Sequence, residues 1–122
     1  MLPINFDILQ ADYPEYAPMW VALRRWFDAN WRKRYIELSV LVRALPEVES
    51  IDLLLAIRKM IDRGMIATAY RVKAPGGSLL EGDFEEPDKI PRKLWDRDHS
   101  RRVSTAEGDL VSGYRWEVVD AA

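Results

Sequence analysis

The sequence predicts an α+β fold: a core of three helices, a small antiparallel sheet, and a long insertion in the hairpin of that sheet. Three observations predict it. Apolar residues recur at spacings of three and four in the first half of the chain, as on the buried face of a helix. Residues 66–74 alternate between apolar and polar side chains and run into a Pro-Gly-Gly turn. Residues 113–119 alternate in the same way and predict a last strand.

Length and composition fit a single domain. The chain has 122 residues, 48% of them hydrophobic and 31% charged, which is enough to bury a core without a metal or a crosslink. We therefore expect one domain over residues 1–122, with residues 82–112 inserted in its hairpin. The absence of Cys excludes disulfides and suits a reducing compartment. No basic leader opens the sequence and no apolar run would cross a bilayer, so we expect a cytoplasmic protein without a membrane partner.

The first predicted helix covers residues 17–31. One apolar stripe at helical spacing runs along it: Trp20, Leu23, Phe27 and Trp31. The dozen residues at the start of the chain show no clear period, so we expect an extended lead-in, with Asp12 available as a helix N-cap.

Two further helices follow a short extended segment at residues 35–37. Ser39 is expected to cap a helix over residues 40–45. The side chains expected to face inward there are Val40, Leu41, Ala44 and Leu45. Ser50 is expected to cap a longer helix over residues 51–62, and Gly64 is suited to the left-handed position after it.

The second half of the sequence predicts a hairpin with an unusually long connection. Ala74-Pro75-Gly76-Gly77 has the pattern of a type II turn, and residues 78–82 predict the returning strand. Within the insertion, residues 87–95 suggest a short helix that Pro91 would interrupt. A loop of this length is usually functional or disordered. Four apolar side chains favour order, because each is expected to be buried: Leu94, Trp95, Val103 and Leu110.

The order of these elements resembles the winged helix-turn-helix superfamily. The resemblance lies in residues 35–72, YIELSVLVRALPEVESIDLLLAIRKMIDRGMIATAYRV, and above all in the Arg-Gly-apolar-Ile segment that leads from the long helix into the sheet. It implies a winged-helix fold in which residues 82–112 extend the wing. The superfamily includes both DNA readers and protein-docking modules, so the resemblance alone leaves the function open.

The orientation of the 51–62 helix carries most of the functional prediction. Its periodicity places Leu53, Ile57 and Met60 inside. The outer side then holds Ile51, Leu54, Leu55 and Arg58, with acidic neighbours in the preceding turn. A helix that reads base edges needs polar or basic side chains there. We therefore expect a non-catalytic protein-interaction module, an adaptor or assembly subunit, that uses Ile51, Leu54, Leu55 and Arg58, with Trp95 contributing. Its partner would be another protein or a second copy. In the alternative that needs no partner, Leu54 and Leu55 lie buried beneath residues 82–112.

A DNA-binding regulator is the second hypothesis. The net charge of −2 is unlike that of a dedicated nucleic-acid binder, yet bases gather in the wing region. The side chains expected to contact phosphates are Arg92, Lys93, Arg97, Arg101 and Arg102. The acidic run in residues 81–88 offers a competing use, because these acids can pair with the bases. In RRWFDANWRKRY, residues 24–35, the aromatic side chains fit the helix core better than a base-stacking surface.

No residue pattern predicts catalysis or a cofactor. His99 is the only histidine, and the Asp96-x-Asp98-His99 sequence is a poor match to a catalytic zinc site, which usually needs three ligands on a rigid frame. A metal-assisted hydrolase at His99 is the third and weakest hypothesis. No phosphate-binding loop is present, and no small-molecule substrate is indicated.

Overall fold

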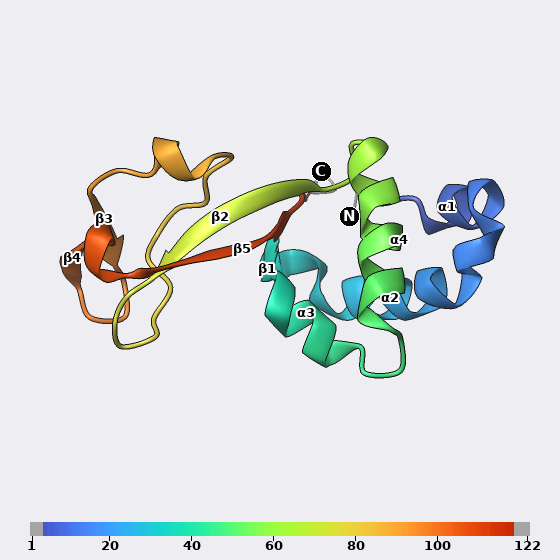
Figure 1. Cartoon of the computed structure of the whole chain (residues 1–122), viewed down its shortest axis with the longest axis horizontal. Helices are drawn as coiled ribbons and strands as arrows, with labels where there is room; N and C mark the ends of the chain where they lie inside the picture. Colours follow the sequence, from blue (N-terminus) through green and yellow to red (C-terminus); the bar gives the residue numbers. More distant parts are fainter. Residues whose placement is uncertain (1–3, 119–122) are drawn as a thin grey trace. The chain divides into compact units, whose positions relative to one another are not determined.

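The computed structural model describes residues 4–118 and has an α+β architecture with a small antiparallel sheet (Figure 1). The contacts divide the chain into two compact units. One, the helical unit, holds the residues up to Ala67 and those from Arg115 on. The other, the hairpin unit, is Thr68–Tyr114. This division cuts the chain within its strands, whereas the sequence suggested an insertion at residues 82–112.

Four helices and a strand build most of the helical unit. They are α1 (Phe6–Asp12), α2 (Ala17–Asn30), β1 (Tyr35–Glu37), α3 (Leu38–Ala44) and α4 (Ser50–Asp62), with 3-10 turns at Pro14–Tyr16 and Trp31–Lys33. The remaining strands are β2 (Ala67–Lys73), β3 (Lys93–Asp96), β4 (Arg101–Ser104) and β5 (Asp109–Arg115), with 3-10 turns at Pro87–Lys89 and Thr105–Glu107. The strand order is β1-β5-β2 in one sheet, and β3 and β4 form a sheet of two strands.

The helix α1 replaces the extended lead-in that the sequence predicted. Asn5 caps it, since its side-chain oxygen accepts a hydrogen bond from the backbone N–H of Ile8 at 3.1 Å. Phe6 and Leu9, three residues apart, are both buried. Asp12 ends α1 instead of capping α2, and its carboxylate pairs with Arg63.

The helix α2 begins at Ala17, as predicted, and its apolar stripe faces inward. Trp20, Leu23 and Phe27 are buried, whereas Trp31 is half-buried in the 3-10 turn after the helix. The ring of Trp116 packs edge-on against Phe27, with centroids 4.8 Å apart. Its indole N–H donates to the carbonyl of Trp31 at 2.9 Å. The aromatic side chains of residues 24–35 therefore serve the core, as expected.

The helix α3 begins two residues earlier than predicted, at Leu38, and Ser39 does not cap it. The Ser39 hydroxyl donates instead to the carboxylate of Glu37 at 3.0 Å. Leu41 and Leu45 are buried, but Val40 and Ala44 are exposed, so the predicted inward face was too wide. A helix of seven residues presents only about two side chains to one side.

The helix α4 packs against α2 (Figure 1), and its buried face is the predicted one. Leu53, Ala56, Ile57 and Met60 are buried along one side. Ser50 is the first helical residue, so the cap position belongs to Glu49, whose side chain caps nothing. Gly64 has a φ of +70°, the left-handed conformation expected of it.

The turn that follows β2, at residues 74–77, is of a different type from the predicted one. The positive φ of +94° lies at Gly77, and Gly76 has none. The N–H of Gly77 donates to the carbonyl of Ala74 at 2.8 Å, and Ala74 in turn bonds Ser78. This is the pattern of a type I turn with a bulge after it, where glycine is needed at the fourth position. Ala69 and Val72 are the buried residues of β2, so its predicted two-residue alternation was wrong.

Residues 78–112 are ordered around a core of their own within the hairpin unit. Its buried side chains are Val72, Ala74, Leu80 and Val103, with Ile90 and Leu94 packed against them. The predicted helix over 87–95 is wrong, because only a 3-10 turn forms before β3. The returning strand over 78–82 is reduced to a bridge at Leu79. Two of the four side chains expected inside are exposed, Trp95 and Leu110.

The last strand, β5, lies earlier than the predicted 113–119, whose end at residue 119 falls outside the described residues. Tyr114 and Trp116 are buried, as expected for one face of this segment. No helix among residues 4–118 is both long and apolar enough to span a membrane.

Candidate functional site

The outer side of α4 forms a compact apolar surface, which we call the α4 surface and define by Ile51, Leu54, Leu55 and Arg58. Ile51 is 65% exposed, Leu54 41% and Leu55 47%. Their spacing of three and four residues places them in one stripe about two turns long. No element of the helical unit buries these side chains, so the interpretation in which Leu54 and Leu55 are core residues has no support within this unit.

Charges around the α4 surface are unequally distributed. At its N-terminal end, Glu49 and Asp52 form no ion pair with any described residue. At its C-terminal end, the guanidinium of Arg58 lies 3.2 Å from the carboxylate of Asp62, one turn further along. An exposed pair at this spacing contributes a few tenths of a kcal/mol, so Arg58 can exchange it for another carboxylate. The N-terminal rim is acidic.

Trp95 does not belong to the α4 surface. It lies in β3 of the hairpin unit, where its side chain is 41% exposed. The pairing of β3 with β4 places Trp95 opposite Arg102, so the two side chains leave the hairpin on the same face. The sequence suggested that Trp95 contributes to the same protein-binding surface as Leu54, and the structure places it in the hairpin unit opposite Arg102.

The five cations of the hairpin unit that the sequence singled out fall into two groups. Arg97 pairs with Glu81. Nearby, the ammonium of Lys89 lies 3.9 Å from the carboxylate of Glu86 and 4.0 Å from that of Glu85. Part of the acidic run in residues 81–88 therefore pairs with nearby basic side chains, as the sequence suggested. The other four form no ion pair with any residue among 4–118: Arg92, Lys93, Arg101 and Arg102. All four are exposed.

A polar cluster that the sequence did not reveal lies inside the hairpin unit. The carboxylate of Asp96 is fully buried, and its Oδ2 atom lies 2.8 Å from Nδ1 of His99 and 3.1 Å from the hydroxyl of Ser78. Burial raises the pKa of Asp96, but the hydrogen bonds from His99 and Ser78 and the charge of the imidazole lower it more, so its pKa lies below the usual 3.8.

This cluster has a structural explanation. The hydroxyl of Ser78 and the imidazole of His99 both approach Asp96, so the hydroxyl contacts the carboxylate and not the imidazole, which is the usual general base of a serine nucleophile. Among the described residues, no group of three or more His, Asp or Glu side chains could hold a metal ion. The carboxylate instead ties the hairpin tip, through His99, to the segment after the first turn, through Ser78.

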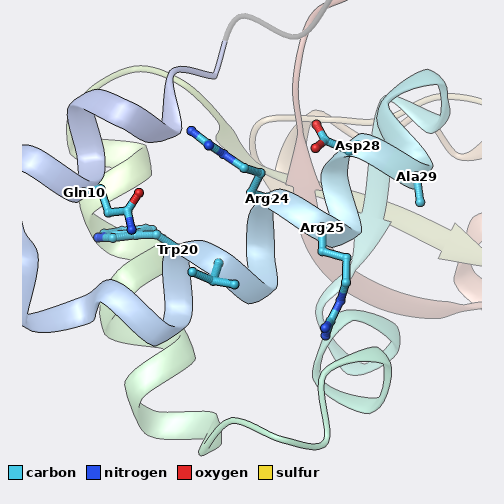
Figure 2. A pocket seen from close by; sticks show the side chains of 7 residues that line it. Gln10, Trp20, Arg24, Arg25, Asp28 and Ala29 are labelled. Atoms are coloured by element: carbon cyan, nitrogen blue, oxygen red, sulfur yellow. The ribbon is translucent and has the colours of Figure 1, made fainter.

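An open hollow of about 730 Å³ lies along the exposed side of α2 (Figure 2). The residues that line it are Gln10, Trp20, Val21, Arg24, Arg25, Asp28 and Ala29. Figure 2 shows Arg24 and Arg25 projecting to opposite sides of the helix. Each guanidinium has a partner, since Arg24 lies 2.6 Å from Asp7 and Arg25 pairs with Glu47. These pairs bind α1 and the α3–α4 turn to α2, and the hollow brings together no nucleophile and base.

Comparisons with known proteins identify no relative. No protein-family model matches the chain, and no curated protein or solved structure matches it.

Proposed function

We propose that this protein is a winged helix-turn-helix protein-interaction module, without catalytic activity of its own, that docks a partner protein on the α4 surface. Two features support the winged-helix interpretation. The elements α2, β1, α3, α4, β2 and β5 follow one another in the order of that superfamily, and β5 lies between β1 and β2 in the sheet. In this arrangement α4 stands where the superfamily places its recognition helix.

The observation that carries the docking proposal is the exposure of three large aliphatic side chains in one stripe of α4. Ile51, Leu54 and Leu55 lie together, whereas scattered single apolar residues on a surface need no explanation. Arg58 adjoins them, and arginine beside apolar anchors is the composition that interface centres favour.

Duplex DNA is a poor fit to the same surface. The residues that would enter a groove are aliphatic and offer base edges no hydrogen bonds, apart from contact with a thymine methyl group. Glu49 and Asp52 have no ion-pair partner among residues 4–118 and lie at the N-terminal end of α4, where each would face the charge of a phosphate. A protein segment with apolar side chains and basic flanks complements both features.

The test compares Leu55→Arg with Val21→Arg, a control at another exposed apolar position that lies on α2. Light scattering after size exclusion measures self-association, and affinity capture from the native host with quantitative mass spectrometry measures the partner. Leu55→Arg should abolish whichever association the wild type shows, and Val21→Arg should leave it intact. The proposal fails if both variants fold and associate like the wild type, or if Leu55→Arg loses no more than Val21→Arg.

A further inference from the structure

The β3–β4 hairpin has one face toward its core and one toward solvent. Leu94 and Val103 are directly opposite each other and pack into the core of the hairpin unit. Because side chains alternate along a strand, the neighbouring pair, Trp95 and Arg102, must point away from that core. Lys93 lies two residues before Trp95 and shares its face, about 7 Å along the strand.

The charge on this face is unbalanced. Lys93 and Arg102 share the face of Trp95, whereas Arg92 and Arg101 alternate to the face of Leu94 and Val103. None of these four cations has a carboxylate partner among the described residues, whereas Arg97 is held by Glu81. Asp96 is buried beneath the strand and is occupied by His99 and Ser78. Two exposed cations therefore flank one exposed indole ring. We call this the hairpin face: Lys93, Trp95 and Arg102.

We propose that the hairpin face binds single-stranded nucleic acid, with one base stacked on Trp95 and the neighbouring phosphates held by Lys93 and Arg102. An aromatic ring between cations is the chemistry that binds single strands without sequence preference, because every base has a π face and every nucleotide a phosphate. The net charge of the whole chain, −2, does not oppose this, since the acids at residues 81–88 have local cationic partners or lie outside the hairpin face.

A single strand fits the hairpin face better than a duplex. In a duplex the π faces of the bases are covered by their neighbours, so Trp95 could reach them only after a base step had been unstacked. In a single strand an open base can lie on the exposed ring at no such cost. This proposal is independent of the α4 surface, because it uses other residues, in the hairpin unit, and another ligand.

Tryptophan fluorescence gives a direct test with the full chain. Trp95 is the one exposed tryptophan, since Trp20 and Trp116 are buried and Trp26 and Trp31 are half-buried. Titration with an oligothymidylate of about 16 nucleotides, at about 50 mM salt, should quench the emission by stacking. Trp95→Phe should keep the affinity within a few-fold but lose the quenching.

Two further variants separate stacking from charge. Trp95→Ala should weaken binding about tenfold or more, as expected for the loss of one stacked base. With two phosphates neutralised, the logarithm of the association constant should fall with the logarithm of salt at a slope of about −1.4, and Arg102→Gln should reduce the magnitude of that slope by about 0.7. Arg97→Gln is the matched control, because Glu81 already holds Arg97, and it should change little.

Several results would overturn the proposal. One is that the oligonucleotide fails to bind at low salt. Others are that Trp95→Ala leaves the affinity unchanged, or that the protein binds a duplex of the same length as tightly as the single strand. Binding to phosphatidylserine vesicles without binding to the oligonucleotide would also refute the proposal, since that result would show that the hairpin face binds a lipid surface. Far-UV circular dichroism of each variant establishes that the fold is intact.

Discussion

Two leucines of α4 test the orientation on which the docking proposal depends. Leu53 and Leu55 are the same residue type, two positions apart, in the middle of one helix. Leu53 is 1% exposed and packs inside, whereas Leu55 is 47% exposed on the α4 surface. Replacing each by Ala removes the same three carbon atoms, so the difference in stability reports the environment alone.

The magnitudes follow from these exposures. Burial of three carbon atoms is worth about 2.4 kcal/mol at about 0.8 kcal/mol per carbon, and the cavity that remains raises the cost of Leu53→Ala to about 3 kcal/mol or more. Leu55→Ala leaves no cavity and loses about half of the transfer term, about 1 kcal/mol, part of which the better helix propensity of Ala offsets. For a chain of this size, the melting temperature should fall by about 10 °C or more in Leu53→Ala and by a few degrees in Leu55→Ala.

Urea unfolding followed by circular dichroism measures the free energy of unfolding of both variants. The slope of that free energy against the urea concentration shows whether the two unfolded states are comparable. The matched Leu55→Ala protein also enters the association assay, where a loss of binding with nearly intact stability is the expected result. If the two variants are destabilised equally, Leu55 is a core residue and the α4 surface does not exist. If neither is destabilised, α4 does not pack on α2 through Leu53.

Three further predictions concern other parts of the molecule. Asp96→Asn should be less stable than the wild type at neutral pH. Because folding lowers the pKa of Asp96, its carboxylate stabilises the fold at pH values above the usual pKa of 3.8. The difference in the free energy of unfolding between the wild type and Asp96→Asn should shrink as the pH falls through the folded pKa. Urea unfolding from neutral pH down to about pH 2 tests this, and a difference that stays constant would contradict it. Gly108→Ala would place a Cβ atom 2.5 Å from the carbonyl oxygen of Lys73, so it should lower the free energy of unfolding by about 1–3 kcal/mol, as measured by thermal unfolding. Gly76→Ala is the control, because its Cβ atom would meet open space, and it should cost less than about 0.5 kcal/mol. Asn5→Ala removes the α1 cap and should cost about 1 kcal/mol by the same measurement, and an unchanged melting temperature would show that α1 does not depend on that cap.

The parts of the fold that the sequence predicted well are those that local periodicity determines. The face and the end of α4 follow from Leu53, Ile57 and Met60 at helical spacing and from Gly64 after them. The caps were less predictable, because an N-cap residue must combine a suitable side chain with a particular backbone conformation. Ser39 and Ser50 have the side chain, but both already lie inside their helices.

Non-local pairing explains most of what the sequence could not predict in the hairpin unit. The strands β3 and β4 have four residues each, too few for a clear alternation, and Leu94 becomes an inward residue only through its pairing with Val103. Once that register is fixed, Trp95 must face outward, although its size alone predicted burial. Ser78 reaches Asp96 across 18 positions, a distance in sequence that no local motif spans.

The exposed leucines of α4 are not explained by folding alone. A side chain at a partly exposed position keeps part of its access to water in the folded state, so the fold gains less from an apolar residue there than at a buried position. Ile51, Leu54 and Leu55 therefore each add less to the stability of the isolated chain than Leu53 does, and their clustering increases its tendency to associate. Burial against a partner would turn the same side chains into a source of binding free energy, whereas Leu53 contributes to folding whether or not a partner is present. The helical period of α4 thus places the residues that stabilise the fold on one side of the helix and leaves the α4 surface, on the other side, available for association.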